Sequence, residues 1–121
     1  MSGSREAAAE ILIDLVALRR NYRLLRQELA NGVELAAVVK ADAYGLGAAQ
    51  VVPVLVDEGC STFFVATLEE GIAVRRLAKH AKIYILNGVI ESDDWPDLSF
   101  HDIRPVLNDL SQVDRLSLIH I

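Results

Sequence analysis

The chain has 121 residues, of which 52% are hydrophobic and 24% charged, with a net charge of −5 and one cysteine. This length fits one domain, and the apolar fraction excludes an intrinsically disordered protein. The acidic balance argues against nucleic-acid binding, which normally requires a basic face. Cys60 has no second cysteine to pair with, and His80, His101 and His120 lie far apart in the sequence. The sequence therefore predicts neither a disulfide framework nor a metal site.

Residues 1–10 are mostly small or polar and lack the basic start and apolar stretch of a signal peptide. No segment approaches the roughly 18 consecutive apolar residues of a membrane-spanning helix. We therefore expect a disordered N-terminus and a cytoplasmic protein that does not associate with membranes.

The first predicted elements are a short strand at residues 11–15 and a helix that begins after Asp14, a residue suited to the N-cap. Apolar residues then recur at spacings of three and four, which places them on one helical stripe. The stripe consists of Leu15, Leu18, Tyr22, Leu25 and Leu29. Four arginines fall largely off this stripe and are expected to face solvent, namely Arg19, Arg20, Arg23 and Arg26. Asn31-Gly32 favours the end of the helix.

Short apolar runs predict four strands in the rest of the chain, and the first of them is expected to be covered on both sides. They cover residues 33–39, 62–66, 82–86 and 103–107. Helices are predicted at residues 48–58, despite Pro53, at residues 67–79, and from Asp109 onwards. Thr67 and Glu70 have the spacing of a capping box. Residues 40–47 are expected to form a glycine-containing loop, and residues 91–102 an irregular or short helical segment.

Strands that alternate with helices at intervals of about 20–30 residues predict a parallel sheet of the α/β class. Two architectures fit this alternation. One is a complete, small doubly wound sheet with about four strands. The other is roughly the first half of a (β/α)8 barrel, whose usual length is about 250 residues. Periodicity does not choose between them.

Lys40 lies at the predicted C-terminal end of a buried strand, where α/β folds place their ligands and catalytic groups. Next to Val38 and Val39 its amine would be partly desolvated, which suits attack on a carbonyl to form a Schiff base. A lone lysine would more often simply reach solvent. Gly45 and Gly47, however, let the backbone approach a ligand, and the helix start that follows them suits a phosphate.

The segment 37–47, Ala-Val-Val-Lys-Ala-Asp-Ala-Tyr-Gly-Leu-Gly, closely resembles the pyridoxal-phosphate (PLP) lysine motif of alanine racemases. Further segments resemble the same family in the same order, namely residues 13–21, 64–71, 83–88 and 104–108. The resemblance implies that residues 11–116 form the N-terminal part, about the first half, of a PLP-binding (β/α)8 barrel. Residues 117–121 would be an unassigned tail.

By this resemblance, Lys40 would hold PLP as an internal aldimine and act as one of two catalytic bases, and Tyr44 would hydrogen-bond the cofactor phosphate. PLP withdraws electrons from the substrate α-carbon, so a base on one face can remove its proton and an acid on the other can return one. In the family the second group is a tyrosine of the partner subunit, which this chain does not contain. Leu46 stands where many relatives have histidine.

The resemblance implies a cytoplasmic, homodimeric racemase that interconverts L- and D-alanine for bacterial cell-wall synthesis. A racemase for serine or with broad specificity stays open, and the alternatives are a noncatalytic single-barrel PLP-binding protein and a barrel-type PLP decarboxylase. The 121-residue chain alone is expected to be inactive and to self-associate, because four strand–helix units cannot close an eight-stranded barrel.

The remaining polar side chains are expected to have structural roles. His80, His101 and Cys60 have no evident partner for chemistry. Glu69 and Glu70 are explained by helix capping, with support of the site as the minor alternative. Asp42 is expected to brace the loop that it belongs to.

Overall fold

The computed structural model describes residues 12–87 and 91–114. Four strands form one parallel sheet, in which strands that follow one another in the sequence are also neighbours in space. They are β1 (Ala37–Val38), β2 (Thr62–Val65), β3 (Lys82–Ile85) and β4 (Ile103–Pro105). A doubly wound sheet reverses its strand order at a switch point. The order β1-β2-β3-β4 lacks this reversal and is that of a barrel segment.

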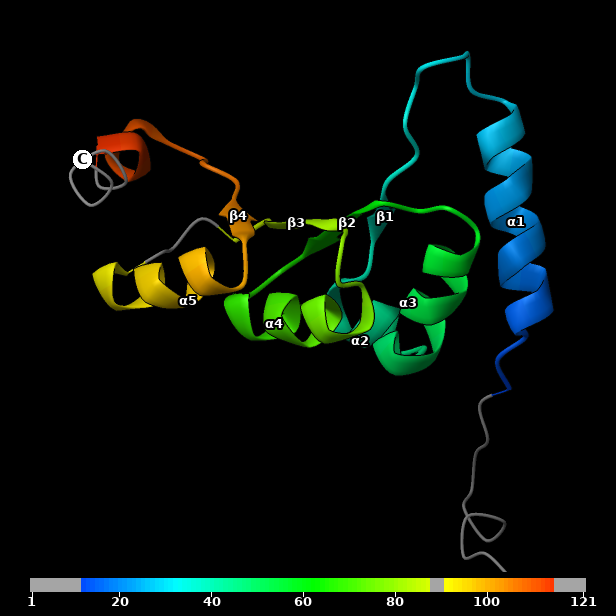
Figure 1. Ribbon diagram of the computed structural model, residues 1–121, viewed down its shortest axis with the longest axis horizontal. Coiled ribbons are helices and arrows are strands. Elements are labelled where there is room, and N and C mark those ends of the chain that lie inside the picture. Colours follow the sequence, from blue (N-terminus) through cyan, green and yellow to red (C-terminus); the bar gives the residue numbers. More distant parts are fainter. Residues whose placement is uncertain (1–11, 88–90, 115–121) are drawn as a thin grey trace, which may run out of the picture.

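The helices alternate with the strands, and α3, α4 and α5 lie along the same side of the sheet, whereas α1 stands at its β1 end (Figure 1). The principal helices are α1 (Leu15–Gln27), α3 (Ala48–Asp57), α4 (Leu68–Leu77) and α5 (Trp95–Phe100), the last preceded by the 3-10 turn Ser92–Asp94. No helix within the described ranges is both long and apolar enough to cross a membrane.

The core lies between the sheet and these helices. Its central row consists of Phe63, Ile83 and Ile103, which are direct neighbours across three strands and at most 4% exposed. Gly71 of α4 lies over this row, since a Cβ atom at this position would lie 3.2 Å from Cδ1 of Ile103. The helix can therefore approach the sheet closely, and a larger side chain at position 71 would push it away.

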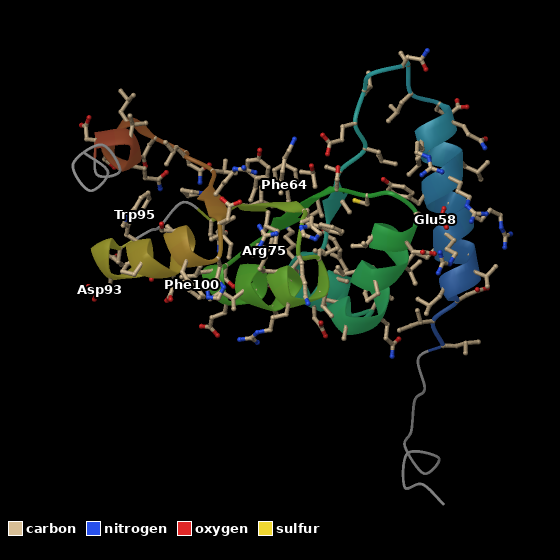
Figure 2. All side chains as sticks on the ribbon, viewed as in Figure 1. Glu58, Phe64, Arg75, Asp93, Trp95 and Phe100 are labelled. Atoms are coloured by element: carbon tan, nitrogen blue, oxygen red, sulfur yellow. The ribbon has the colours of Figure 1, made fainter. Side chains whose placement is uncertain are left out.

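The opposite face of the sheet carries a second row, formed by Val38, Phe64, Tyr84 and Arg104. The rings of Phe64 and Tyr84 stack at 5.1 Å, and the Arg104 guanidinium lies 5.7 Å from the Tyr84 ring centroid. Phe64 lies on the side of the sheet away from α4 (Figure 2). Val38 is 44% exposed, so within the described ranges this face is only partly covered. In a closed barrel the face without helices is the interior.

Of the four arginines expected to face solvent, Arg20, Arg23 and Arg26 are exposed and Arg19 is half-buried, but three of them also contact Glu58. Arg19 and Arg23 form ion pairs with Glu58, which directly follows α3. The side chain of Glu58 is only 5% exposed. Arg23 uses two nitrogens, at 2.6 and 2.8 Å from the two carboxylate oxygens, and Arg26 donates to the Glu58 carbonyl. Spacings of four and three place these residues on a stripe of their own, which meets the end of α3 (Figure 2).

Two predicted strands also need correction. Residues 12–14 are irregular and Leu15 already belongs to α1, so the strand predicted at residues 11–15 is wrong over the described part; residue 11 lies outside it. The strand predicted at residues 33–39 is reduced to Ala37–Val38. Within the described ranges β1 pairs only with β2, and because Val38 is 44% exposed, β1 is not covered on both faces as predicted.

The other predicted elements agree with the structure to within a few residues. Asp14 caps α1 by accepting the Ala17 N–H at 3.0 Å, and α3 continues through Pro53. Residues 110–114 are helical, and Asp109 accepts the Gln112 N–H at 3.0 Å. The predicted disordered start, residues 1–10, and the predicted tail, residues 117–121, lie outside the described residues.

Candidate active site

The carboxyl ends of the four parallel strands lie at one edge of the sheet. At this edge, three backbone hydrogen bonds continue the hydrogen-bonding pattern beyond the ends of the strands. The N–H groups of Val39, Leu86 and Val106 donate to carbonyls of the neighbouring strand at 2.7–2.9 Å. Lys40 follows Val39 directly and is half-buried. Its amine has no hydrogen bond or ion pair with any residue in the described part of the chain. An amine free of protein partners at this edge is available to a ligand.

The segment after Lys40, labelled α2 (Lys40–Tyr44), is a left-handed turn rather than an open loop. Four consecutive residues that are not glycine have positive φ angles of 53°, 55°, 58° and 57°, namely Ala41, Asp42, Ala43 and Tyr44. Each costs about 1–2 kcal/mol relative to a right-handed conformation. Strain of this kind persists only where the surroundings hold it, and it clusters at functional sites.

Backbone hydrogen bonds close the turn from within. The Ala43 N–H donates to the Val39 carbonyl at 3.0 Å, and the Gly45 N–H donates to the Ala41 carbonyl at 2.9 Å. Gly45 and Gly47 also have positive φ angles, as their residue type predicts. The two glycines in the sequence thus predicted a loop here. Nothing in the sequence predicted the left-handed conformation of the four residues before Gly45.

Two carboxylates, one within the turn and one from α4, connect the turn to the neighbouring helices. Asp42 accepts the N–H of Ala48, the first residue of α3, at 2.8 Å, in agreement with the expected bracing role. Glu70 completes the predicted capping box of α4: its Oε1 accepts the N–H groups of Ala66 and Thr67 at 2.7 and 3.3 Å. Its other oxygen, Oε2, accepts the Ala41 N–H at 2.8 Å. The position of Lys40 is therefore fixed by α3 and by α4.

Tyr44 ends the turn, and its side chain is 62% exposed. Its hydroxyl has no hydrogen-bond partner among the residues that the structure describes. One side of Tyr44 lines an apolar hollow of about 250 Å³ between α1 and the β1–α3 segment, together with Leu18, Val39, Ala43 and Leu46. Lys40 does not line this hollow.

The other candidate residues lie at the opposite edge of the sheet. Cys60, His80 and His101 precede β2, β3 and β4, whereas Lys40 follows β1. Cys60 is buried, which raises the pKa of its thiol, and the thiol lies 3.4 Å from the Thr62 carbonyl oxygen. Within residues 12–87 and 91–114 no three His, Cys, Asp or Glu side chains are placed to hold a metal ion.

Comparison with known proteins identifies the family of this chain. The sequence model described as "Alanine racemase, N-terminal domain" matches residues 13–120. The chain belongs to the alanine racemase family. The alanine racemase of Methylobacterium nodulans is 46% identical over 113 residues, which are 93% of this chain and 30% of that protein. The alanine racemase of Rickettsia prowazekii is 46% identical over 103 residues, or 84% of this chain and 25% of that protein.

Solved alanine racemases have the same fold over this region. The enzyme of Bartonella henselae, described with covalently bound pyridoxal phosphate, superposes with a TM-score of 0.81 at 38% identity, over 88% of this chain and 31% of that chain. The biosynthetic alanine racemase of Pseudomonas aeruginosa superposes with a TM-score of 0.81 at 35% identity, over 90% of this chain and 30% of that chain. The predicted partial barrel and family are thus confirmed, and the chain spans about 30% of the length of these alanine racemases.

Proposed function

We propose that this chain is the N-terminal part of a PLP-dependent racemase that interconverts L- and D-alanine, with Lys40 as its cofactor lysine. The observation that carries the proposal is the amine of Lys40, which has no partner among residues 12–87 and 91–114 and lies at the carboxyl edge of the sheet on a strained turn that Asp42 and Glu70 hold. The names of the relatives and the PLP bound covalently in the Bartonella henselae structure support it.

The side chains of the turn fit this cofactor chemically. A primary amine can bond to the aldehyde carbon of PLP, and a phenolic hydroxyl can donate to a phosphate oxygen. Lys40 and Tyr44 supply these two groups from the two ends of one fixed turn, and neither has another partner in the described residues. When bound, PLP draws electrons from the substrate α-carbon and so acidifies its proton.

In this proposal Lys40 takes up or returns the α-proton at Nζ on one face of the substrate, and Tyr44 orients the cofactor through its phosphate. Inversion also needs a second acid–base group on the other face. The chain spans about 30% of its relatives, and we propose that this group comes from the part of the protein beyond the matched region, across the interface of a homodimer. The enzyme would act in the cytoplasm and supply D-alanine for the cell wall.

The proposal is tested with the full-length protein that carries this chain, by measuring D-alanine formed from L-alanine. We expect racemisation to fall by at least about 10³-fold in Lys40→Ala, because the variant loses a positioned base and the cofactor attachment. Lys79→Ala is the matched control, since Lys79 is exposed and follows α4 at the opposite edge of the sheet.

Unchanged racemisation in Lys40→Ala would contradict the proposal. Cofactor binding without any racemisation in the unmodified protein would instead favour a noncatalytic PLP-binding protein, and release of carbon dioxide from the amino acid would favour a decarboxylase. Parallel assays with L-serine and other amino acids determine the substrate.

A further inference from the structure

The carboxylate of Glu70 joins the two connections that follow β1 and β2. Its Oε1 accepts N–H groups of Ala66 and Thr67 at 2.7 and 3.3 Å, and its Oε2 accepts the N–H of Ala41 at 2.8 Å. Ala41 lies 29 residues earlier in the chain, so this contact is not part of the local structure of α4.

Capping of α4 does not require the contact with Ala41. A capping box needs one side-chain oxygen at its fourth position, and Oε1 of Glu70 already fills this role. The Thr67 hydroxyl completes the box by accepting the Glu70 N–H at 3.2 Å. The bond from Ala41 to Oε2 is therefore additional, and its effect falls on the turn after Lys40.

Ala41 is where the strained turn begins. Its N–H belongs to the peptide unit that links it to Lys40, so an acceptor for this N–H fixes the plane from which the Lys40 side chain departs. The three residues that follow also have positive φ angles, and reverting them to the right-handed region would release several kcal/mol of strain. A charged acceptor at the first residue opposes this reversion, because hydrogen bonds to ionised groups are the stronger ones.

We propose that Glu70 is a positioning residue for Lys40: it ties the peptide between Lys40 and Ala41 to the β2–α4 connection and so fixes the backbone from which the lysine amine would reach the cofactor. This inference rests on the proposed role of Lys40. Glu70 touches neither cofactor nor substrate in this account, and it acts only through the backbone of Ala41.

Glutamine at position 70 separates the two tasks of the carboxylate. An ionised carboxylate accepts at both oxygens, whereas a glutamine amide accepts at one atom and donates at the other. Glutamine is accepted in capping boxes. If its oxygen replaces Oε1 in the box, its NH2 group faces the Ala41 N–H, and donor meets donor. This orientation is the favoured one, because two N–H groups point at the Oε1 position and only one points at the Oε2 position. We therefore expect Glu70→Gln to keep the helix cap and to lose the tie to Ala41.

The experiment compares PLP binding by full-length apoprotein variants, followed through the absorption band of the bound cofactor and its dependence on pH. We expect Glu70→Gln to weaken PLP binding by about 10- to 100-fold, the loss that corresponds to one hydrogen bond to a charged group. The pH at which the absorption band of bound PLP changes should also differ from that of the unmodified protein. Glu69→Gln removes an equal charge from the neighbouring exposed position and should match the unmodified protein.

Thr67→Ala is the second control, because it weakens the capping box but leaves both Glu70 oxygens in place. It should lower the melting temperature and leave the affinity for PLP unchanged. A Glu70→Gln protein with unmodified affinity and pH profile would overturn the positioning role, as would one that only melts earlier, like Thr67→Ala. If only the unmodified protein folds, hydrogen exchange of its Ala41 amide is measured instead. Slow exchange supports the hydrogen bond to Glu70, and free exchange overturns it.

The inference and the proposed function fail in different ways. If the unmodified protein binds no PLP at Lys40, both fall. If it binds PLP there and Glu70→Gln does so equally well, only the role of Glu70 falls.

Discussion

At the scale of single residues, the structure depends on side chains that bind backbone groups far away in the sequence. Arg75 of α4 is the strongest case (Figure 2). Its guanidinium donates to five backbone carbonyls at 2.6–3.2 Å, those of Ala78, Lys79 and Ala81 nearby and those of His101 and Asp102 more than 25 residues away. One side chain thus joins the end of α4, the start of β3 and the turn before β4.

We expect Arg75→Lys to lower the free energy of unfolding by about 2 kcal/mol or more. A lysine ammonium has three donors on a single atom and cannot reproduce the planar fork of the guanidinium, so several of the five carbonyls, three of them in part-buried hydrogen bonds, lose their partners. Arg76→Lys at the neighbouring exposed position is the control and should change stability by less than about 0.5 kcal/mol. Denaturant unfolding of the full-length protein measures both, and equal stabilities for the two variants would contradict the assignment.

At the scale of elements, α1 is attached to α3 through ion pairs as well as through the apolar contacts of Leu18 and Tyr22 with the core. Arg23 and Arg19 bind the Glu58 carboxylate and lower its pKa from 4.5 to about 2. A carboxylate with a lowered pKa stabilises the folded state above the pKa of the unfolded chain, and this contribution is lost as the pH falls towards the folded pKa. The attachment of α1 is therefore expected to weaken between about pH 4.5 and pH 2.

Glu58→Gln should remove this part of the pH dependence. Melting temperatures measured from pH 6 to pH 2 are expected to fall less steeply in the variant than in the unmodified protein. Glu28→Gln is the control, because Glu28 is exposed at the end of α1 and should leave the curve unchanged. Parallel curves for Glu58→Gln and the unmodified protein would show that the ion pairs do not hold α1.

The elements that the sequence predicted well are those that local pattern determines. Asp14, the capping box of Thr67 and Glu70, and the apolar runs of β2 and β3 each act through neighbours in the sequence. The shortening of β1 could not be predicted in this way, because the length of a strand depends on its partners. The exposure of Arg20, Arg23 and Arg26 was predicted correctly, but the ion pairs of Arg19 and Arg23 were not, since their acceptor lies more than 30 residues away.

The candidate site likewise combines features that the local sequence predicts with features that depend on the folded arrangement. The motif around Lys40 indicated the lysine, the tyrosine and the two glycines, because these residue types carry the chemistry. It did not indicate the left-handed turn from Ala41 to Tyr44, since alanine and tyrosine have no preference for this conformation. The turn follows from the contacts with Glu70 and Ala48, which only the folded arrangement brings together.

At the scale of the whole molecule, the four-stranded sheet has two edges and, in the part of the chain that the structure describes, a face that helices do not cover (Figure 1). Large apolar side chains are exposed as well, among them Phe100 at 84% and Leu110 at 81%. Unpaired strand edges and apolar patches promote association. We expect the isolated 121-residue chain to self-associate and to show no racemase activity. Analytical ultracentrifugation tests this, and a monodisperse monomer that melts cooperatively would contradict it.

The central claim is that the amine of Lys40 binds PLP. The most direct measurement is borohydride reduction of the full-length protein with bound PLP, followed by mass spectrometry of its peptides. We predict one cofactor adduct, on Lys40, that is absent from Lys40→Ala and retained in Lys79→Ala. An adduct on another lysine of the protein, or no adduct at all, would contradict the claim.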